Sequence, residues 1–510
     1  MDNFEYFAGM FAKKNTSCEV KRIIKPFLLS LGCILLYSFS TLGQLNHIHS
    51  SKDYNPSTGR ILFDSLQTKY IIIDSIVISG NKKTKDRIIR REVDFIDGDT
   101  IFAYNIENDL LWIKNRIFNL FLFHYVDLTL TGPDSIEKHL HIVVKERLNI
   151  SILPEGGLAD RNFNEWWVTR NHDISRVYGG INVKLKNVWG LSHLFKFRAY
   201  AGFNEKIETS YFIPYLNKRL KTGLQVNALV EFNPQVAIQS IDHKLSYREF
   251  KSRGREKFSI GFLFIRRNEF YSQHQFGPYF QYASISDSIA ILNPNYFLNG
   301  ANTQKDFGLK YIYSLDKRDF NNYPLKGHLF RMESDYQYLL TEDRSQTNLL
   351  SLKSEFTQFI PLGRRFYLAA GAMGKLSNPK QQPYFNQRGL GYAREAISGY
   401  ELYVIDGQSY GLIKTNLRWK VFSIKHSINF IPHHSFKSIP ISMYFKIYSD
   451  AGYVADNAYN PYNNFLSNRL LAGGGAGIDI VTYLNLVGRI EYSINQLGQT
   501  GLYLHVKSGW

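Results

Sequence analysis

The chain has 510 residues, a formal net charge of +17 and two cysteines, Cys18 and Cys33. Both cysteines lie in a predicted presequence, so disulfides, Cys-ligated metals and thiol nucleophiles are excluded from the mature chain. No nucleic-acid-binding motif accompanies the positive charge, so we expect no nucleic-acid partner and assign the charge to a basic lumen and to rims facing anionic lipid. Aromatic residues make up 15% of the chain. Such an excess is typical of transmembrane β-barrels.

Residues 1–43 are predicted to be a secretory signal peptide. The stretch KRIIKPFLLSLGCILLYSFSTLG, from Lys21 to Gly43, has a basic start, an apolar core and small residues where a peptidase would cut. A membrane-anchoring helix is the alternative, but the apolar run is shorter than the ~20 residues that a span needs. Residues 44–68 are polar and without periodicity, and they are predicted to form a flexible lead-in.

Residues 69–147 predict a small α+β domain. YIIIDSIVISGNKKT, which begins at Tyr70, is typical of a β-branched strand ending in a Gly-Asn turn. TKDRIIRREVDF and NIENDLLWIKNRIFNLFLF have helical spacing, and YVDLTLTG and KHLHIVVKE follow as paired strands. The expected order is β-α-α-β-β. This order, together with Gly98–Asp99 and the VKE of Val144–Glu146, resembles a POTRA domain.

Residues 148–510 lose the helical period and alternate apolar with polar residues. In FKFRAYAGF, Phe195 and Phe197 face one way while Lys196 and Arg198 face the other. Roughly sixteen such segments follow one another, which predicts an antiparallel transmembrane β-barrel of about 16 strands rather than a soluble sandwich. The count runs from about fifteen to seventeen because residues 244–250 and 273–287 are ambiguous. The predicted fold class is therefore membrane all-β, preceded by the small α+β domain.

A long aromatic connection, residues 377–409, interrupts the alternation. It contains AISGYELYVIDGQSYG and leads directly into a long strand. Connections of this length are rarely structureless. Four successive residues, Ile397, Ser398, Gly399 and Tyr400, form its most distinctive motif. Glycine at position 399 would allow a tight turn there.

This loop and the strands around it resemble the outer-membrane assembly and translocation superfamily of BamA, TamA and the two-partner-secretion transporters. In that superfamily, POTRA domains precede a sixteen-stranded barrel whose sixth extracellular loop folds into the lumen with a (Val/Ile)-Arg-Gly-(Phe/Tyr) tip. The matching tip here is Ile397 to Tyr400, with Ser398 in place of the arginine. The resemblance therefore implies a loop lock that lacks its usual cation. Arg394 and Asp479 are the candidate partners for a substitute lock.

Two further features agree with this resemblance. SLDKRDFNNYPLKGHLF resembles the family's periplasmic turn, with Asp316, Asp319, Pro324 and Gly327 at the characteristic positions. The chain ends in GLYLHVKSGW, an alternating strand that carries Tyr503 and closes on Trp510. The resemblance implies that this strand serves as the terminal-strand signal of an assembly-dependent barrel.

The implied function is assembly or translocation of other polypeptides at the bacterial outer membrane, with the POTRA domain in the periplasm. Its expected partners are outer-membrane lipid and unfolded outer-membrane or exported polypeptides, with periplasmic chaperones or accessory lipoproteins as further candidates. The mechanism would be non-covalent, through β-augmentation of the POTRA sheet and a weak barrel seam. The alternative is a dedicated secretion or porin-like channel without insertase activity.

An enzyme is not expected. Three His pairs or repeats occur, HIH at 47–49, HLH at 139–141 and PHHS at 432–435, but no third metal ligand accompanies any of them. GQSYG at Gly407–Gly411 has the Gly-x-Ser-x-Gly spacing, but it leads into an alternating strand and not into the strand-to-helix turn of a nucleophile elbow. Neither a phosphate-binding loop nor an HExxH motif is present. We therefore predict no catalytic residues, no cofactor and no metal.

Overall fold

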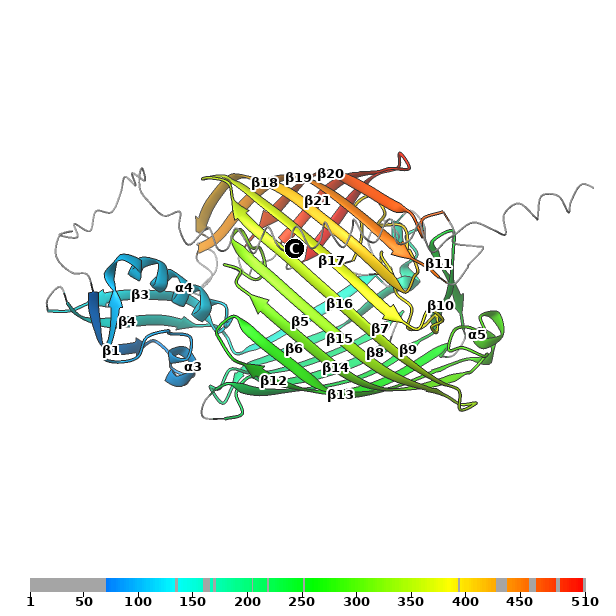
Figure 1. Ribbon diagram of the computed structural model, residues 1–510, viewed down its shortest axis with the longest axis horizontal. Coiled ribbons are helices and arrows are strands. Elements are labelled where there is room, and N and C mark those ends of the chain that lie inside the picture. Colours follow the sequence, from blue (N-terminus) through cyan, green and yellow to red (C-terminus); the bar gives the residue numbers. More distant parts are fainter. Residues whose placement is uncertain are drawn as a thin grey trace, which may run out of the picture. The chain divides into compact units, whose positions relative to one another are not determined.

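The computed structural model describes residues 70–507, with gaps at 134–135, 159–165, 168–170, 204, 218–219, 251–252, 393–394, 428–437, 458–464 and 483–486. The predicted signal peptide and lead-in, residues 1–68, lie outside the described residues. In the described ranges, no helix is long and apolar enough to span a membrane. The structure confirms the predicted fold class, a sixteen-stranded antiparallel sheet preceded by a small α+β domain (Figure 1).

The N-terminal domain has one more strand than the sequence pattern indicated. Its elements are β1 (Tyr70–Ser79), α3 (Asp86–Arg90), β2 (Asp99–Phe102), η1 (Ala103–Asn105), α4 (Ile106–Phe118), β3 (Phe123–Thr131) and β4 (Glu137–Glu146). The four strands form a sheet in the order β2-β1-β4-β3, with β1 and β4 parallel in its centre. The unexpected strand, β2, is four residues long, too short for alternation to reveal it.

The core of this domain lies between the sheet and its two helices. Alternate residues of β1, Ile71 and Ile73, are buried, and so are Ile113 and Ile117, which lie one helical turn apart on α4. The apolar residues repeat every second position on the strand and every three to four positions on the helix, so each element has one apolar face, and the two faces pack together. The domain has a continuous core of its own.

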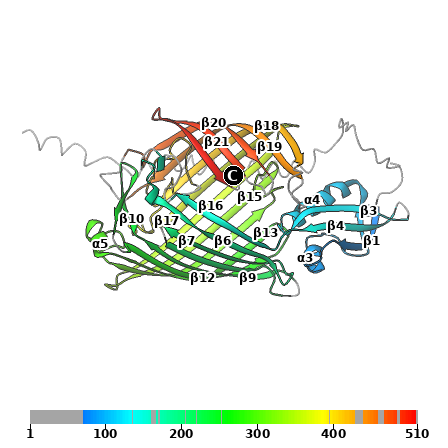
Figure 2. The ribbon, with the colours of Figure 1, turned by 180° about the vertical axis from the view of Figure 1, so that it is seen from behind.

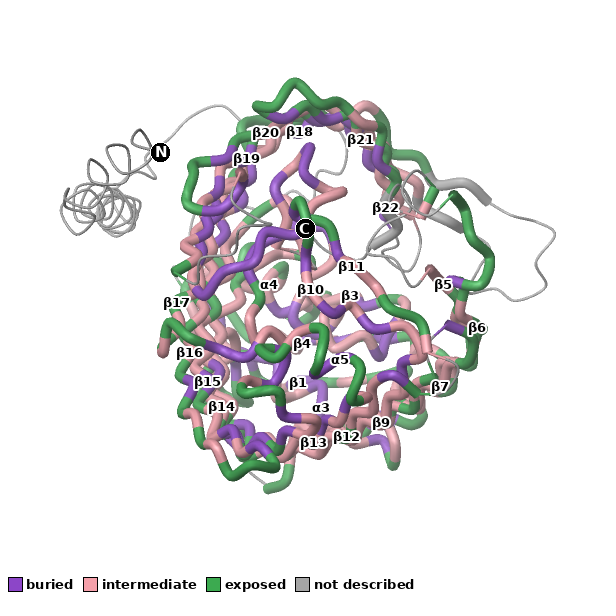
Figure 3. The backbone as a smooth tube through the Cα atoms, turned by 90° about the vertical axis from the view of Figure 1, so that its right-hand side faces the viewer, coloured by how far each residue is buried: buried purple, intermediate pink, exposed green. Residues whose placement is uncertain are grey.

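The barrel sheet runs without a break from β22 to β5 around a lumen (Figures 1 and 3). Its strands are β5 (Ile150–Leu158), β6 (Val177–Val188), β7 (His193–Gly202), β8 (Glu205–Ile213), β9 (Thr222–Asn233), β12 (Arg255–Arg267), β13 (Ser272–Ile285), β14 (Thr303–Asp316), β15 (Gly327–Thr341), β16 (Gln346–Pro361), β17 (Phe366–Asn378), β18 (Ser409–Ser427), β19 (Ser438–Ala455), β20 (Leu470–Val481), β21 (Val487–Asn495) and β22 (Thr500–Lys507).

The two ambiguous segments separate cleanly in three dimensions. Residues 272–285 form barrel strand β13. Residues 244–249 form β11, which pairs with β10 (Gln235–Ile241) in a separate two-stranded hairpin. A short helix, α5 (Asp287–Leu292), follows β13, and a 3-10 turn, η3 (Ile174–Arg176), precedes β6. Figure 2 shows the hairpin and α5 at the same end of the barrel.

Burial follows the predicted alternation. On β19, Phe445 and Ile447 are 41% and 51% exposed, whereas Tyr444 and Lys446 are 4% and 5% exposed. On this strand the outward-facing side chains are apolar, and the alternate residues enter a polar lumen. An outward apolar belt on a sheet of this size fits a lipid bilayer, where every backbone group must be paired.

A charge introduced on the lipid face should be costly. Phe445→Arg is expected to destabilise the folded barrel by ~2–4 kcal/mol if the residue lies near the bilayer midplane, because a guanidinium must then be held in hydrocarbon. Lys196→Arg, on the lumen face of β7, is the control and should change stability by less than ~0.5 kcal/mol. Stability can be measured as the urea midpoint of the folded, heat-modifiable band in liposomes. Equal losses in the two variants would contradict the assignment of faces.

Candidate functional site

The long connection between β17 and β18 is the sixth of the loops at the end of the barrel opposite the N-terminal domain. The chain passes from that domain into β5, so odd-numbered connections along the barrel, such as β5 to β6 and β17 to β18, lie at the far end. The tip of this connection, at Ser398 and Gly399, contacts Asp450 of β19, Gly473 of β20 and Asn495 of β21. The loop is therefore folded into the lumen.

The tip of the loop is held by a buried carboxylate on β19. The Ser398 backbone N–H donates to Asp450 Oδ2 over 3.0 Å, and the Ser398 hydroxyl donates to the same oxygen over 2.6 Å. Lys414 Nζ lies 3.6 Å from Asp450 Oδ2 and supplies the compensating positive charge. Asp450 is 3% exposed, so these contacts lie away from bulk water. A buried carboxylate that accepts two hydrogen bonds and faces an ammonium group makes a firm anchor.

Glycines on both sides permit the close approach of tip and wall. Gly399 has a φ of +83°, and its carbonyl accepts a hydrogen bond from Asn495 Nδ2 over 2.7 Å. A Cβ at Gly473 of β20 would lie 1.8 Å from the Ser398 carbonyl oxygen. Residues 473–475 are glycines and have no side chains, so the tip can lie directly against the backbone of β20.

Apolar contacts surround the tip. Ile397 and Tyr400 are 1% and 2% exposed and belong to one buried cluster. Its other buried members are Leu390, Ile405, Tyr410, Leu412, Val454, Leu466 and Leu471. These residues come from the loop itself, from β18 to β20 and from the β19–β20 loop, so burying the tip also fixes one side of the barrel.

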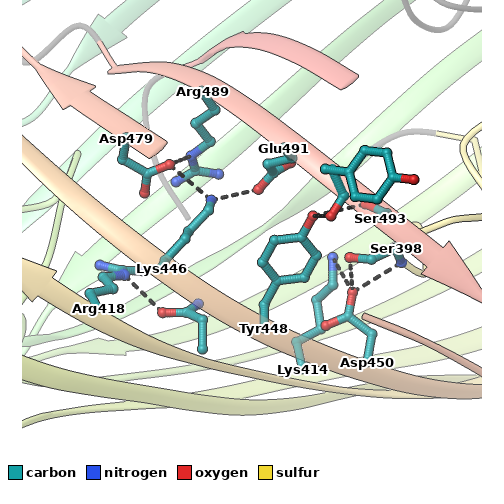
Figure 4. A network of polar contacts seen from close by, with 12 residues as sticks. Ser398, Lys414, Arg418, Lys446, Tyr448, Asp450, Asp479, Arg489, Glu491 and Ser493 are labelled. Carbon is teal, nitrogen blue, oxygen red and sulfur yellow. Dashed lines mark hydrogen bonds and ion pairs between the residues drawn. The ribbon is translucent and has the colours of Figure 1, made fainter. Parts of the chain in front are cut away.

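The structure places the predicted site residues unequally. Ile397 to Tyr400 meet the wall, but the carboxylate at the tip is Asp450. Asp479, which we considered as a partner of the tip, instead pairs with Lys446 over 2.9 Å (Figure 4). Asp479 also accepts from the Tyr323 hydroxyl over 3.0 Å. Tyr503 of β22 is buried. Arg394 and Trp510 lie outside the described residues.

The sequence assigns Asp450 to the lumen face but not to the loop tip. Asp450 shares the strand parity of Tyr444, Lys446 and Tyr448, which marks it as lumen-facing. The pattern does not say which lumen carboxylate meets a tip 52 residues away, because that depends on strand register across the sheet.

The two ends of the sheet meet at a seam. β5 and β22 come next to each other around the ring, yet the sheet begins at one and ends at the other (Figure 3). In the part of the chain that the structure describes, no strand pairing joins them. They have nine and eight residues, whereas β16 and β18 have sixteen and nineteen. Among the described residues, β5 and β22 are therefore the two barrel strands that are paired on one side only.

The N-terminal domain is attached to the turns at the near end of the barrel. Glu92, which is 1% exposed, accepts a bidentate pair of hydrogen bonds from Arg267 over 2.7 and 2.8 Å. Asn187 Nδ2 donates to the Thr84 hydroxyl over 2.8 Å, and the Arg116 guanidinium lies 4.0 Å from the centre of the Phe270 ring. These contacts hold the domain at the mouth of the lumen.

A separate cap lies at the far end. His243, in the turn of the β10–β11 hairpin, is fully buried; its carbonyl accepts from the Val404 N–H over 2.7 Å, and its Nε2 accepts from the Leu466 N–H over 3.0 Å. The hairpin is thus joined to the lumen loop and to the β19–β20 loop. Burial lowers the pKa of His243 to about 4, so the ring is neutral at pH 7. Sequence alternation alone would not single out this histidine.

A metal centre finds no support in the geometry. Across the described residues, no group of three or more His, Cys, Asp and Glu side chains could hold a metal ion. The polar contacts at the tip and at Asp479 are structural ion pairs and hydrogen bonds.

Comparison with known proteins identifies the N-terminal domain. Residues 71–147 match the model of the POTRA family, described as surface antigen variable number repeat. This segment is a POTRA domain. The resemblance predicted from the β-strand order and the VKE motif is confirmed. A POTRA domain followed by a sixteen-stranded barrel with an apolar belt places the barrel in the outer membrane and the POTRA domain in the periplasm.

Solved structures resemble the whole chain at low identity. BamA from Haemophilus ducreyi lacking POTRA domains 1–3 is 14% identical, with a TM-score of 0.48 over 86% of this chain and 84% of that chain. CdiB from Acinetobacter baumannii is 13% identical, with a TM-score of 0.46 over 86% and 74%. CdiB from Escherichia coli is 11% identical, with a TM-score of 0.48 over 89% and 92%. No curated protein matches the chain.

The tip anchor can be measured as a coupling energy. Ser398→Ala removes a hydroxyl that donates to a buried carboxylate and should cost ~1–3 kcal/mol of barrel stability. Asp450→Asn should cost a similar amount because it removes the charge opposite Lys414. In Ser398→Ala/Asp450→Asn the losses should be less than additive by at least ~0.5 kcal/mol. Urea unfolding followed by tryptophan fluorescence provides the values. Simple additivity would mean that the pair does not interact.

The cap should weaken in acid. The pKa of His243 in the closed cap lies below the ~6.5 of an exposed histidine. As the pH falls, His243 is therefore protonated more readily in a hairpin released from the cap, and protonation favours release. The cap is therefore most stable above pH ~6.5 and loses stability down to about pH 4. Ion conductance in a planar bilayer should rise over this interval when the outer side is acidified. His243→Gln, which does not titrate, should flatten the response, and an unchanged response would show that another group controls it.

Proposed function

We propose that this protein assists the insertion or translocation of other polypeptides at the outer membrane. The observation that carries the proposal is the seam, because lipid does not tolerate unpaired strand edges and a client hairpin could pair with either one. A POTRA domain held at the lumen mouth supports the same function. It is positioned to hand a client from the periplasm to the barrel.

The POTRA sheet offers a place for a client strand. Strand β2 lies at one edge and is paired on one side with β1. Around it, Ile96, Phe102 and Tyr104 are 66%, 69% and 79% exposed. Exposed apolar side chains beside a sheet edge favour β-augmentation, in which the backbone gives affinity and alternate side chains give preference. Unfolded outer-membrane or exported polypeptides are the expected clients, and periplasmic chaperones that deliver them are further candidate partners.

A passive channel is the second candidate. It would keep the barrel and use the lumen as a pore. The lumen loop and the hairpin cap argue against it, since both place side chains and backbone across the passage. The absence of an arginine at position 398 favours divergence from the insertases of the superfamily, which keeps a dedicated transporter within the proposal.

Depletion of the protein in its host, followed by quantitative proteomics of the outer membrane, tests the proposal. Loss of many barrel proteins would identify a general assembly factor, and loss of a single exported protein would identify a dedicated transporter. An unchanged outer-membrane proteome would contradict both and leave the channel.

The seam itself can be closed chemically. Apart from the predicted presequence the chain has no cysteine, so Ile152→Cys on β5 and Leu504→Cys on β22 can be joined by a reducible bis-maleimide. Both side chains are exposed, and cross-linking is expected to abolish client insertion or export until the linker is reduced. Phe280→Cys with Phe307→Cys joins two strands that are already paired and is the control, for which no loss is expected. Full activity of the cross-linked seam would exclude a mechanism through these strands.

A further inference from the structure

Three lysines line one stretch of the lumen wall. Lys184 and Lys186 lie two residues apart on β6, and Lys196 lies directly opposite Lys184 on β7. Like charges placed opposite each other across a sheet destabilise it unless something neutralises them. Their strand neighbours with the other parity, such as Phe195 and Phe197, belong to the lipid face. We call Lys184, Lys186 and Lys196 the lysine stripe.

The stripe differs from the rest of the lumen in its pairing. Lys310 lies 3.0 Å from Glu333, Lys414 lies 3.6 Å from Asp450, and Lys446 lies 2.9 Å from Asp479. On β7 itself, Arg198 pairs with Glu208 over 2.7 Å. Within the ranges that the structure describes, by contrast, none of the three stripe ammonium groups forms an ion pair or a hydrogen bond. Glu208, which pairs with Arg198, is the one carboxylate that acts electrostatically on Lys196.

The stripe lies where a client would enter. Asn187, next to Lys186, donates to Thr84 of the POTRA domain, which places this end of β6 at the periplasmic mouth. Lys186 also lines a cavity of about 450 Å³ that POTRA helix α4 shares with the barrel wall. Trp112 and Tyr271 line the same cavity and provide apolar surface. On its other side, β6 pairs with β5, the first strand of the seam.

We propose that the lysine stripe receives acidic side chains of an extended client polypeptide as it passes from the POTRA domain to the seam. This inference rests on the proposed function and adds the class of segment that is bound. Lys184 and Lys186 are spaced at two residues of a strand, ~6.6 Å, which is also the spacing of alternate side chains in an extended client. The charges are spread along two strands instead of converging on one point, as a site for a small anion would require.

Binding of a simple peptide probe tests the stripe directly. The probe is a fluorescein-labelled peptide of alternating Glu and Thr, about twelve residues long, which spans the stripe at ~3.3 Å per residue. A Gln–Thr peptide of the same length controls for backbone binding. Fluorescence anisotropy with the detergent-solubilised full chain gives the affinity over a range of salt concentrations.

The variant to compare is Lys184→Gln/Lys186→Gln/Lys196→Gln. Its matched control removes the same number of charges from the far end of the barrel, through Lys244→Gln, Lys305→Gln and Lys380→Gln, all of which are exposed. Heat-modifiable mobility confirms that each variant is folded. The stripe variant should bind the acidic peptide about ten-fold more weakly than the wild type, and the control should retain its affinity, because only the stripe faces the peptide.

Two results would overturn the inference. If the stripe variant and its control lost the same affinity for the Glu–Thr peptide, the effect would be one of net charge. If the Glu–Thr and Gln–Thr peptides bound equally well, recognition of acidic side chains would be excluded. If the stripe variant bound lipopolysaccharide more weakly than the wild type but bound the peptide with unchanged affinity, the stripe would be a lipid site. The inference would then also be wrong. None of these outcomes bears on the depletion experiment, so the proposed function stands or falls separately.

Discussion

Backbone hydrogen bonding in lipid is the constraint on which this structure depends. A strand that crosses a bilayer has no water to satisfy its N–H and C=O groups, so each must have a neighbour on both sides. The antiparallel register from β6 to β21 meets this demand along long strands. The two end strands, β5 and β22, have nine and eight residues, and among the described residues no pairing joins them to each other. Any activity that needs the barrel to accept another chain is expected at that place.

Interior segments compensate for a weak seam by stabilising the wall beside it. The loop tip is anchored on β19 through Asp450, rests on glycines of β20 and accepts a bond from Asn495 of β21. These three strands precede β22 in the sheet, so the loop supports the C-terminal side of the seam from within. Ser398 has a short side chain, so the tip reaches Asp450 only by lying close to the wall. The thin glycine surface and the direct hydrogen bonds to Asp450 are consistent with a tip that sits closer to the wall.

Much of the fold could be read from the sequence because alternation over long strands is a strong signal. It gave the faces correctly for Phe445 and Lys446, and a count of strands close to the observed one. It failed at β2, whose four residues carry too little pattern, and it could not tell β11 from a barrel strand, because a hairpin outside the barrel alternates in the same way. The loop tip was recognisable through its Gly-Tyr pair. Its partner Asp450 was not, because contacts across the lumen are set by register and loop path, which leave no local trace in the sequence.

The turn between β14 and β15 shows how one short segment can join distant parts of the molecule. Asn119 of the POTRA domain donates to the Asp319 carbonyl over 3.2 Å, and at the other side of the turn Tyr323 donates to Asp479 of β20. Arg418 of β18, which is 1% exposed, donates to the Pro324 carbonyl over 3.0 Å. The turn is thus in contact with both the POTRA domain and two strands of the C-terminal part of the sheet, β18 and β20. A displacement of the POTRA domain that kept the Asn119 bond would therefore pull on the same segment that holds Asp479.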